Sequence, residues 1–331
     1  MPMIDLNNEE QVRSYDSFVK SYYDSNYMQT IAYNSILDAN PVTVYTELNG
    51  NIISGMTVIL KKMFGKYAYA VSIGGPVCDI YDTNVVQALL KELEPYFKAN
   101  NVAYLKMCPE IIYTDKLKEL CKSAHFKILS KNSLKFKLDR QLCRLIIDLT
   151  SKDYDQAYEE LSDKVKSNID NAIRKKMSVK ASSTKRELNL FLDNYRTDKL
   201  VDITGIKDIE NTKKLYSALP DECFNIYSVF DEDENKISQI LTITYNKRCY
   251  IKYEINGDSQ DSVKARALIY NQIIKDCINQ GIKTLDIGFW DKSNELDYLF
   301  KRGFIQNTYT ENIGELYKVY RPMITKLSKI I

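Results

Sequence analysis

Histidine is nearly absent from the sequence. The chain of 331 residues has one histidine, His125, in the stretch CKSAHFKIL, where no nucleophile motif accompanies it. Ser–His and Cys–His catalysis and most zinc sites use histidine, so its scarcity argues against both. We expect His125 to lie on the surface at the end of a helix, and we expect no bound metal.

Cysteine is sparse, and long apolar runs are missing. The seven cysteines are scattered and form no C-x-x-C pair, which argues against a disulfide framework or a structural zinc site. No 18 apolar residues follow one another, and the start MPMIDLNNEEQ has no basic segment before an apolar one. We therefore expect neither a transmembrane segment nor a secretory signal, and a reducing, cytoplasmic location.

Neither sign of charge is in large excess. The 46 Lys and Arg residues face 44 Asp and Glu residues, a net charge of +2, so an anionic partner must be bound by a local patch. The length is sufficient for two domains, and the apolar and charged fractions of 44% and 27% are typical of a folded soluble protein.

Strand and helix signals begin at residue 42. Alternating apolar and polar residues on either side of an Asn-Gly pair are a strong hairpin signal. The pattern predicts, in order, a strand, a turn, two strands, a helix and a strand at 42–48, Asn49–Gly50, 52–60, 67–73, roughly 84–100 and 102–107.

The same order recurs in the second half of the chain. Three strands, a helix that Gly281 is placed to end, and a final strand are predicted at 226–230, 237–245, 249–255, about 262–279 and 284–289. An offset of about 180 residues pairs Tyr69 with Tyr250. We predict a duplication that gives two similar α/β lobes; the alternative is a chance likeness of generic α/β segments.

A strand–helix–strand unit after a meander indicates the fold of the acetyltransferases. Those enzymes bind the pyrophosphate of CoA with an R/Q-x-x-G-x-G/A loop at a helix N-terminus. The corresponding loops here, INGDSQDSVKAR and IGGPVCDIYD, lack that pattern. The prediction is an α/β (α+β) fold of two tandem acetyltransferase-like (GNAT-type) lobes whose acyl donor is not acetyl-CoA.

A dense basic segment lies between the two copies. Residues 164–186 contain eight basic side chains and one acidic side chain, Asp170. The apolar Val165, Ile169, Ala172 and Ile173 recur at helical spacing, which predicts a helix with a packed face and a basic face. We interpret the basic face as a site for RNA or another polyphosphate; the alternative is a solvated surface helix. The basic residues are Lys164, Lys166, Arg174, Lys175, Lys176, Lys180, Lys185 and Arg186.

Several motifs, in order along the chain, resemble those of the Fem-type peptidoglycan branching aminoacyltransferases. The similar segments are MPMIDLNNEEQVRSYDSFV with Gln29, YAYAVSIGGPVCDIYD, KVKSNIDNAIRKKMSV, LDIGFWDKSNELDYLFKRGF and IGELYKV. The resemblance implies two acetyltransferase-like lobes with a cleft between them. It also implies that the C-terminal segment returns to the first lobe, and that no helical arm is inserted. We expect residues 1–145 with 315–331 in the first lobe and 146–314 in the second.

The resemblance also implies an activity. An amino acid (Ala, Ser or Gly) would pass from aminoacyl-tRNA to the third-residue amine of UDP-N-acetylmuramoyl-pentapeptide or lipid II, with no cofactor beyond that co-substrate. The basic residues Lys164, Lys166, Arg174, Lys175, Lys176 and Lys180 would bind tRNA. Two alternatives stay open: an N-acyltransferase with another donor, and a non-catalytic relative that binds tRNA or precursor.

The resemblance places Lys301 and Phe300 at the reaction centre. A fixed ammonium there would stabilise the carbonyl oxyanion of ester aminolysis, and Phe300 would exclude water. The alternative for Lys301 is a surface lysine before a turn. The acceptor amine must lose a proton, and Asp286 and Glu315 are the candidate carboxylates. Asp286 alternatively braces its loop, and Glu315 alternatively forms an ion pair that links the lobes.

Other positions match the family less closely. Where relatives have Asp-Pro-Glu this chain has Cys108-Pro109-Glu110, and Gly75–Pro76 follows Gly74 instead of an arginine. Lys207 falls where a relative has a phosphate-binding arginine, whose bidentate geometry a lysine does not reproduce. Tyr253 matches a tyrosine of the acceptor site; the alternative is a tyrosine in the core or on the face of a sheet. We expect Lys207, Tyr253, Gly75, Pro76 and Glu315 to contact the substrate.

Overall fold

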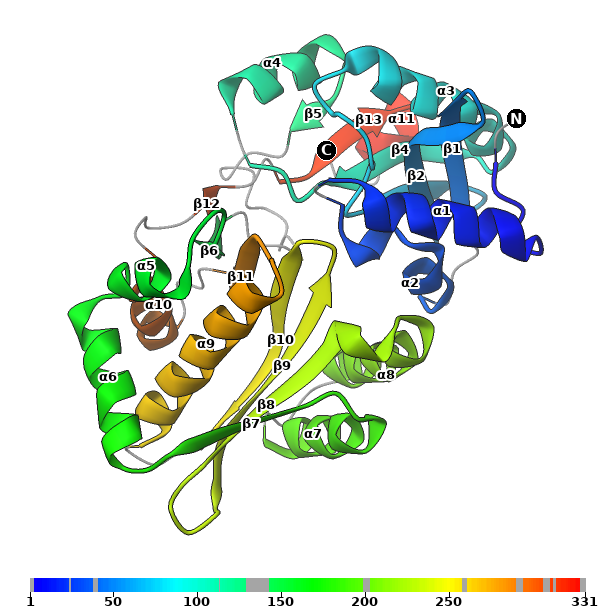
Figure 1. Cartoon of the computed structure of the whole chain (residues 1–331). Helices are drawn as coiled ribbons and strands as arrows, with labels where there is room; N and C mark the ends of the chain where they lie inside the picture. Colours follow the sequence, from blue (N-terminus) through cyan, green and yellow to red (C-terminus); the bar gives the residue numbers. More distant parts are fainter. Residues whose placement is uncertain are drawn as a thin grey trace. The chain divides into compact units, whose positions relative to one another are not determined.

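The fold is taken from a computed structural model (Figure 1), which describes residues 3–23, 25–37, 41–112, 114–128, 143–198, 203–257, 261–289, 294–305, 310–311 and 314–327. By their contacts the residues divide into two compact units. Unit 1 comprises residues 1–142 with 311–331, and unit 2 comprises residues 143–310. The sequence placed the divisions after residues 145 and 314. Each unit is described by itself.

Unit 1 is built on one sheet whose strand order is β1-β2-β3-β4-β13-β5. Its strands are β1 (Val42–Leu48), β2 (Asn51–Lys62), β3 (Ala68–Ile73), β4 (Val102–Cys108), β5 (Lys127–Ile128) and β13 (Leu316–Val319). Its helices are α1 (Glu9–Ser21), η1 (Tyr27–Gln29), α2 (Ile31–Ser35), α3 (Thr83–Ala99), α4 (Asp115–Ser123) and α11 (Pro322–Leu327).

The alternation in β2 sends its side chains to opposite faces of this sheet. Met56 and Val58 lie in the core that α3 covers, whereas Thr57 contacts Tyr15 of α1 on the other face. The predicted hairpin between β1 and β2 is confirmed: Asn49 and Gly50 both have positive φ, as a type I′ turn requires. His125 is exposed directly after α4, as expected.

Unit 2 is built on a second sheet, with strand order β12-β6-β11-β10-β9-β8-β7. Its strands are β6 (Cys143–Asp148), β7 (Ser178–Ser182), β8 (Phe224–Phe230), β9 (Lys236–Tyr245), β10 (Arg248–Asn256), β11 (Thr284–Phe289) and β12 (Thr310–Glu311). Its helices are α5 (Tyr154–Glu159), α6 (Asp163–Arg174), α7 (Lys185–Asp198), α8 (Ile203–Ala218), η2 (Asp221–Cys223), α9 (Ser262–Asn279) and α10 (Glu295–Arg302).

Helix α9 is the central helix of unit 2. It runs along the sheet against β8 and β9, and α6 packs beside it (Figure 1). Since it has neighbours on several sides, its buried residues include Ala265, Ile269, Tyr270 and Ile273, not a single narrow stripe. Helices α7 and α8 pack on each other, and α7 contacts β8, β9 and β10. Gly281, with φ +67°, follows the end of α9 as the sequence predicts.

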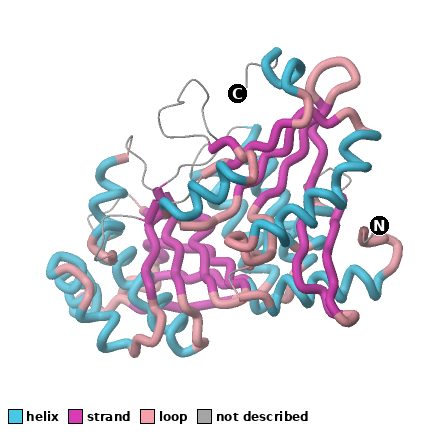
Figure 2. Tube along the Cα trace, turned by 90° about the horizontal axis from the view of Figure 1, so that it is seen from above, coloured by secondary structure: helices cyan, strands magenta, loops and turns pink. Residues whose placement is uncertain are grey.

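The two sheets share one strand pattern. In unit 1, β1–β2 and β2–β3 are antiparallel, and α3 connects β3 to the parallel β4. In unit 2, β8–β9 and β9–β10 are antiparallel, and α9 connects β10 to the parallel β11. In each sheet a further antiparallel strand follows, β13 beside β4 and β6 beside β11. Figure 2 shows the strands of each sheet side by side with helices around them. The predicted repeat of strands and helix is confirmed.

The last described strand of the chain lies in the first sheet. β13 pairs antiparallel with β4 on one side and with β5 on the other, after the whole of unit 2 has intervened in the sequence. The return of the C-terminal segment is thereby confirmed. Among the described helices, none has the length and apolar character needed to cross a bilayer.

Candidate functional site

Lys301 is a buried cation on α10. Its side chain is 11% exposed, and its Nζ lies 3.0 Å from Asp297 Oδ2 and 3.5 Å from Glu254 Oε1. Asp297 is one helical turn earlier on α10, and Glu254 comes from β10. An exposed lysine before a turn would not be held by two carboxylates in the protein interior, so this alternative does not fit the structure.

Arg266 completes a cluster of four charges around Lys301. From α9 its Nε lies 2.6 Å from Glu254 Oε2 and its second amino group lies 2.6 Å from Asp297 Oδ1. Each carboxylate therefore binds Arg266 with one oxygen and Lys301 with the other. The Tyr270 hydroxyl donates to Glu254 Oε1 at 2.8 Å. We call Glu254, Arg266, Asp297 and Lys301 the charge cluster.

The cations of the charge cluster keep its carboxyl groups ionised. Burial raises the pKa of Glu254 and of Asp297, but Arg266 and Lys301 outweigh burial and hold both pKa values below the ordinary value. Two positive and two negative side chains share a buried site, which makes the cluster neutral as a whole.

Phe300 packs on the charge cluster. Its ring lies 4.1 Å from the guanidinium carbon of Arg266 and meets the Tyr270 ring edge-on, with centroids 5.4 Å apart. A cation over an aromatic face is attracted by the ring electrons, and the ring also displaces water from the cations. Phe300 and Lys301, predicted as a pair, therefore border the same buried site.

Asp286 and Lys301 both lie next to Gly288. Asp286 is buried on β11, and its Oδ2 accepts from Arg144 Nε at 2.5 Å. Its Oδ1 accepts from the backbone N–H of Gly288 at 2.9 Å. Gly288 has φ +101°, and a Cβ built there would lie 3.4 Å from Lys301 Nζ. The structure thus brings together Asp286, Gly288 and Lys301, with Asp286 bracing the loop.

Glu315 lies in unit 1 and is also tied to neighbours. Its Oε1 is 2.7 Å from Lys106 Nζ on β4, and its Oε2 accepts from the Tyr317 hydroxyl on β13 at 2.6 Å. Cys108 Sγ is 3.9 Å from Oε1. Lys106 and Tyr317 belong to the same unit as Glu315, so these contacts join strands within unit 1.

Tyr253 belongs to a second polar group in unit 2. Tyr253 is buried on β10, and its hydroxyl donates to Asp208 Oδ2 at 2.5 Å. Lys252 Nζ lies 2.9 Å from the same oxygen, and the Tyr195 ring packs on Tyr253 at 4.5 Å. Burial and then the Asp208 charge raise the pKa of Tyr253 well above its ordinary value, so this hydroxyl is a donor. Lys207, beside Asp208 on α8, is exposed.

Gly75 and Pro76 lie where β3 ends, held against η1. The Gln29 amide donates from Nε2 to the Ile73 carbonyl at 2.7 Å, and its Oε1 accepts from the Thr57 N–H at 2.9 Å. A Cβ on Gly75 would overlap this amide. Gly74 has φ +71° and lies against the Asn26 side chain. Glycine is required at Gly75 for space and at Gly74 for backbone conformation.

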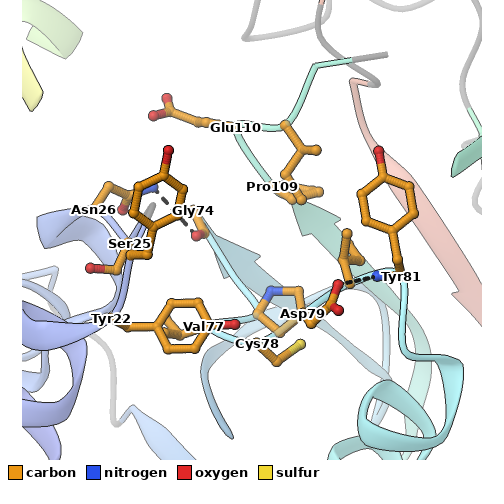
Figure 3. Close-up of a pocket in the computed structure, with 14 residues that line it drawn as sticks. Tyr22, Ser25, Asn26, Gly74, Val77, Cys78, Asp79, Tyr81, Pro109 and Glu110 are labelled. Carbon is orange, nitrogen blue, oxygen red and sulfur yellow. Dashed lines mark hydrogen bonds between the residues drawn. The ribbon is translucent and has the colours of Figure 1, made fainter. Parts of the chain in front are cut away.

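A cavity of about 370 Å³ opens beside this turn (Figure 3). It is bounded by the segment after α1, the segment after β3 and the segment after β4. Three tyrosines and two carboxylate residues, Asp79 and Glu110, give its wall a polar and aromatic character. The lining residues are Tyr22, Tyr23, Ser25, Asn26, Gly74, Pro76, Val77, Cys78, Asp79, Ile80, Tyr81, Pro109, Glu110 and Ile111.

Comparison with known proteins places the chain in a family. The model of the FemAB family matches residues 11–199, which is 189 of the 331 residues. The chain belongs to the FemAB family. It is 23% identical over 335 residues to the UDP-N-acetylmuramoylpentapeptide-lysine N(6)-alanyltransferase of Weissella viridescens, with 98% of each chain covered.

Solved structures with a similar fold include FemX and a tandem GNAT protein. The crystal structure of FemX has a TM-score of 0.80 and 16% identity, with 99% of each chain covered. A tandem GNAT protein from the clavulanic acid biosynthesis pathway has a TM-score of 0.54 and 6% identity, covering 96% of this chain and 97% of that one. The predicted family and the predicted fold of tandem acetyltransferase-like lobes are both confirmed.

Basic residues of the segment between the two copies form ion pairs with acidic residues in this FemAB chain. The sequence pattern did not predict these ion pairs. Lys175 Nζ lies 2.7 Å from Asp261, Lys180 lies 2.8 Å from Glu234 and Lys166 lies 2.9 Å from Glu159. Lys176 forms an ion pair with Glu232. Lys164 and Arg174 are exposed. Much of the local charge is therefore balanced at the surface.

The prediction of one basic helix over 164–186 was wrong in two respects. Helix α6 ends at Arg174, Lys180 lies on β7, and Lys185 and Arg186 begin α7. Val165, Ile169 and Ala172 are buried on α6 as predicted, but Ile173 is 58% exposed. Ile173 lies in the last turn of α6, at the edge of the stripe formed by Val165, Ile169 and Ala172. Ile173 therefore lies on the solvent side of α6, next to the exposed Arg174.

Four charged residues near the predicted site were missed from the sequence. Arg266, Glu254 and Asp297 surround Lys301, and Asp208 holds Tyr253. The available signal for Asp297 was its spacing of four residues before Lys301, which puts both on one face of a helix. Arg266 and Glu254 gave no local signal, because their partners come from other elements.

Proposed function

We propose that this chain is a tRNA-dependent aminoacyltransferase that acts on a peptidoglycan precursor. It would add Ala, Ser or Gly to the third-residue amine of UDP-N-acetylmuramoyl-pentapeptide or lipid II, forming the first bond of an interpeptide bridge. The observation that carries the proposal is the match along 98% of both chains to a lysine N(6)-alanyltransferase of precursor peptides. The location would be cytoplasmic, where both substrates occur.

The reaction is aminolysis of an ester. The neutral lysine amine of the precursor attacks the ester carbonyl of aminoacyl-tRNA, a C–N bond forms, and the carbonyl oxygen becomes an oxyanion. The C–O bond to the terminal ribose then breaks, the amine loses its proton and the ribose hydroxyl gains one. An ammonium fixed beside the carbonyl lowers the energy of the oxyanion.

We assign that ammonium to Lys301. It is buried, held in place by Asp297 and Glu254, and adjacent to the Gly288 backbone. Phe300 would keep water from the ester, which would otherwise hydrolyse. Asp286 would support the site by fixing the Gly288 loop. Glu315 would serve unit 1 by joining β4 and β13, because its oxygens already accept from Lys106 and Tyr317.

We assign the peptide of the acceptor to unit 1. The cavity beside Gly75 and Pro76 has two carboxylate residues and three tyrosines on its wall, a setting that favours an ammonium-bearing peptide side chain. Lys207 and Tyr253 of unit 2 stay predicted substrate contacts, Lys207 as an exposed cation for a phosphate of the precursor. The donor tRNA would lie on the basic segment that contains Lys164, Lys166, Arg174, Lys175, Lys176 and Lys180.

The test is direct. Purified protein is incubated with a charged tRNA pool and UDP-N-acetylmuramoyl-pentapeptide, and the products are analysed by mass spectrometry. We expect the precursor mass to increase by one aminoacyl residue, and we expect no product with uncharged tRNA or with a precursor whose lysine amine is acetylated. Binding of both substrates without product, for both the soluble and the lipid-linked acceptor, would instead support the non-catalytic alternative. Product formed from another acyl donor would support the N-acyltransferase alternative.

A further inference from the structure

Arg266 binds the same two carboxylates that bind Lys301. Arg266 binds Glu254 Oε2 and Asp297 Oδ1, both at 2.6 Å. The other two oxygens, Glu254 Oε1 and Asp297 Oδ2, face Lys301. A guanidinium has a planar fork of donors, which can fix two carboxylates at once in a defined orientation. The positions of the oxygens around Lys301 therefore depend on Arg266.

The charge of the cluster also depends on Arg266. Without it, two carboxylates would surround one ammonium, and the buried site would carry a net negative charge. An oxyanion forming next to Lys301 would then be repelled by the excess carboxylate at short range, in a site where charges are poorly screened. With Arg266 present the cluster is neutral, and the Lys301 ammonium can stabilise a new negative charge.

Arg266 has a third contact with the same site. Its guanidinium carbon lies 4.1 Å from the Phe300 ring, and Phe300 precedes Lys301 in the chain. The contacts of Arg266 thus reach Lys301 through the carboxylates on one side and through the neighbouring aromatic residue on the other.

We propose that Arg266 is a positioning residue for the transfer reaction: it offsets the charge of Glu254 and Asp297 so that the Lys301 ammonium can act on the oxyanion. This inference rests on the proposed function, because it assigns a role within that reaction. Arg266 does not touch the reacting atoms in this account, and its effect passes through Lys301.

Charge compensation tests the proposal. Arg266→Met leaves one carboxylate in excess, and Asp297→Asn in the same chain removes that excess. We expect Arg266→Met to lower kcat about tenfold or more with the KM for both substrates little changed, and we expect the double variant Arg266→Met with Asp297→Asn to recover part of the loss. Arg266→Lys keeps the charge but not the fork, so it should lie between wild type and Arg266→Met. Arg302→Met, an exposed change on α10, is the matched control.

A double-mutant cycle shows whether Arg266 acts through Lys301. In a Lys301→Ala chain, a further Arg266→Met change should have little effect on kcat, because the residue through which Arg266 acts is already gone. Equal losses of kcat in both backgrounds, or a double variant with Asp297→Asn that is slower than Arg266→Met alone, would overturn the proposal and leave Arg266 as a packing residue.

Urea unfolding at several pH values gives a readout that needs no activity. In Arg266→Met the excess carboxyl group should have a raised pKa in the folded state, so the stability it contributes is lost as the pH rises from about 5 to about 8. We expect this loss relative to wild type, and we expect Asp297→Asn to remove it. If the wild-type protein shows no transfer but the variants show this pattern of stability, the proposed function alone is disproved. A pattern unchanged between wild type and Arg266→Met would disprove the charge balance itself.

Discussion

The side-chain amide of Gln29 occupies the space that a Cβ atom on Gly75 would need. The amide is itself fixed, because it donates to the Ile73 carbonyl and accepts from the Thr57 N–H. Gln29 and the strand end after β3 therefore determine each other's position, and with it one side of the cavity that Pro76 lines.

Gly75→Ala should destabilise the protein by about 1–3 kcal/mol, because the added methyl group must displace a buried, hydrogen-bonded amide. The free energy of unfolding in urea measures this. Gly65→Ala is the comparison, since a Cβ there meets nothing within 4 Å and its cost comes from φ +56° alone. If Gly75→Ala proves no worse than Gly65→Ala and leaves precursor binding intact, the contact with Gln29 does not shape the site.

Lys301→Ala should lower kcat by about 10²–10³ and leave precursor binding nearly unchanged, because the ammonium acts mainly in the transition state. The variant should also lose ~3 kcal/mol of stability, since two buried carboxylates lose a partner. Lys301→Arg should restore little activity, because a guanidinium is larger and flatter. Steady-state kinetics, with binding measured by calorimetry, separate these effects.

The exposed neighbour Arg302 on α10 provides the control for Lys301. Arg302→Ala should change kcat by less than about twofold and stability by less than about 0.5 kcal/mol. A wild-type kcat in Lys301→Ala would remove Lys301 from the reaction. Weakened precursor binding with kcat preserved would make it an anchor for an anionic group of the substrate.

Replacing Lys175 and Lys176 with alanine should weaken tRNA binding and reduce the slope of log K against log salt by about one or two. Because both lysines are paired with acids, Asp261 and Glu232, binding must exchange those partners for phosphates. Glu232→Gln should therefore strengthen tRNA binding at low salt. Equal slopes in wild type and the lysine variant, at equal folding stability, would remove this segment from the donor site.

Acid should destabilise the protein through the charge cluster. The pKa of Glu254 and of Asp297 is lower in the folded protein than its ordinary value, so their contribution to stability is present above the ordinary carboxyl pKa and is lost as the pH falls below about 4. Asp16 contributes to the pH dependence of stability with the opposite sign. Burial raises its pKa, and this effect exceeds the lowering by two backbone hydrogen bonds. Urea midpoints of wild type and Asp297→Asn should converge as the pH is lowered from about 6 to about 3; parallel curves would contradict the assignment.

Features that depend on residues close together in the sequence could be predicted. Alternation gave the strands of both sheets, and the Asn49–Gly50 pair gave the hairpin. The charge cluster was not predictable in this way, because Arg266 meets Glu254 across 12 positions and Asp297 across 31. Lys301 was found by resemblance, but Glu254 and Arg266 come from β10 and α9, which meet α10 only in the folded chain. The need for glycine at Gly75 likewise comes from Gln29, a residue of another element.

The position of β13 has a consequence for how the chain folds during synthesis. β13 lies between β4 and β5, yet residues 143–310, 168 residues of unit 2, are made before it. At about 5–20 residues per second the ribosome needs roughly 10–30 s for that stretch. During that time no strand lies between β4 and β5. Glu315, which binds Lys106 of β4, has not yet been synthesised. An unpaired edge invites pairing with other chains, so unit 1 becomes complete, and its edge protected, only after unit 2 has been synthesised.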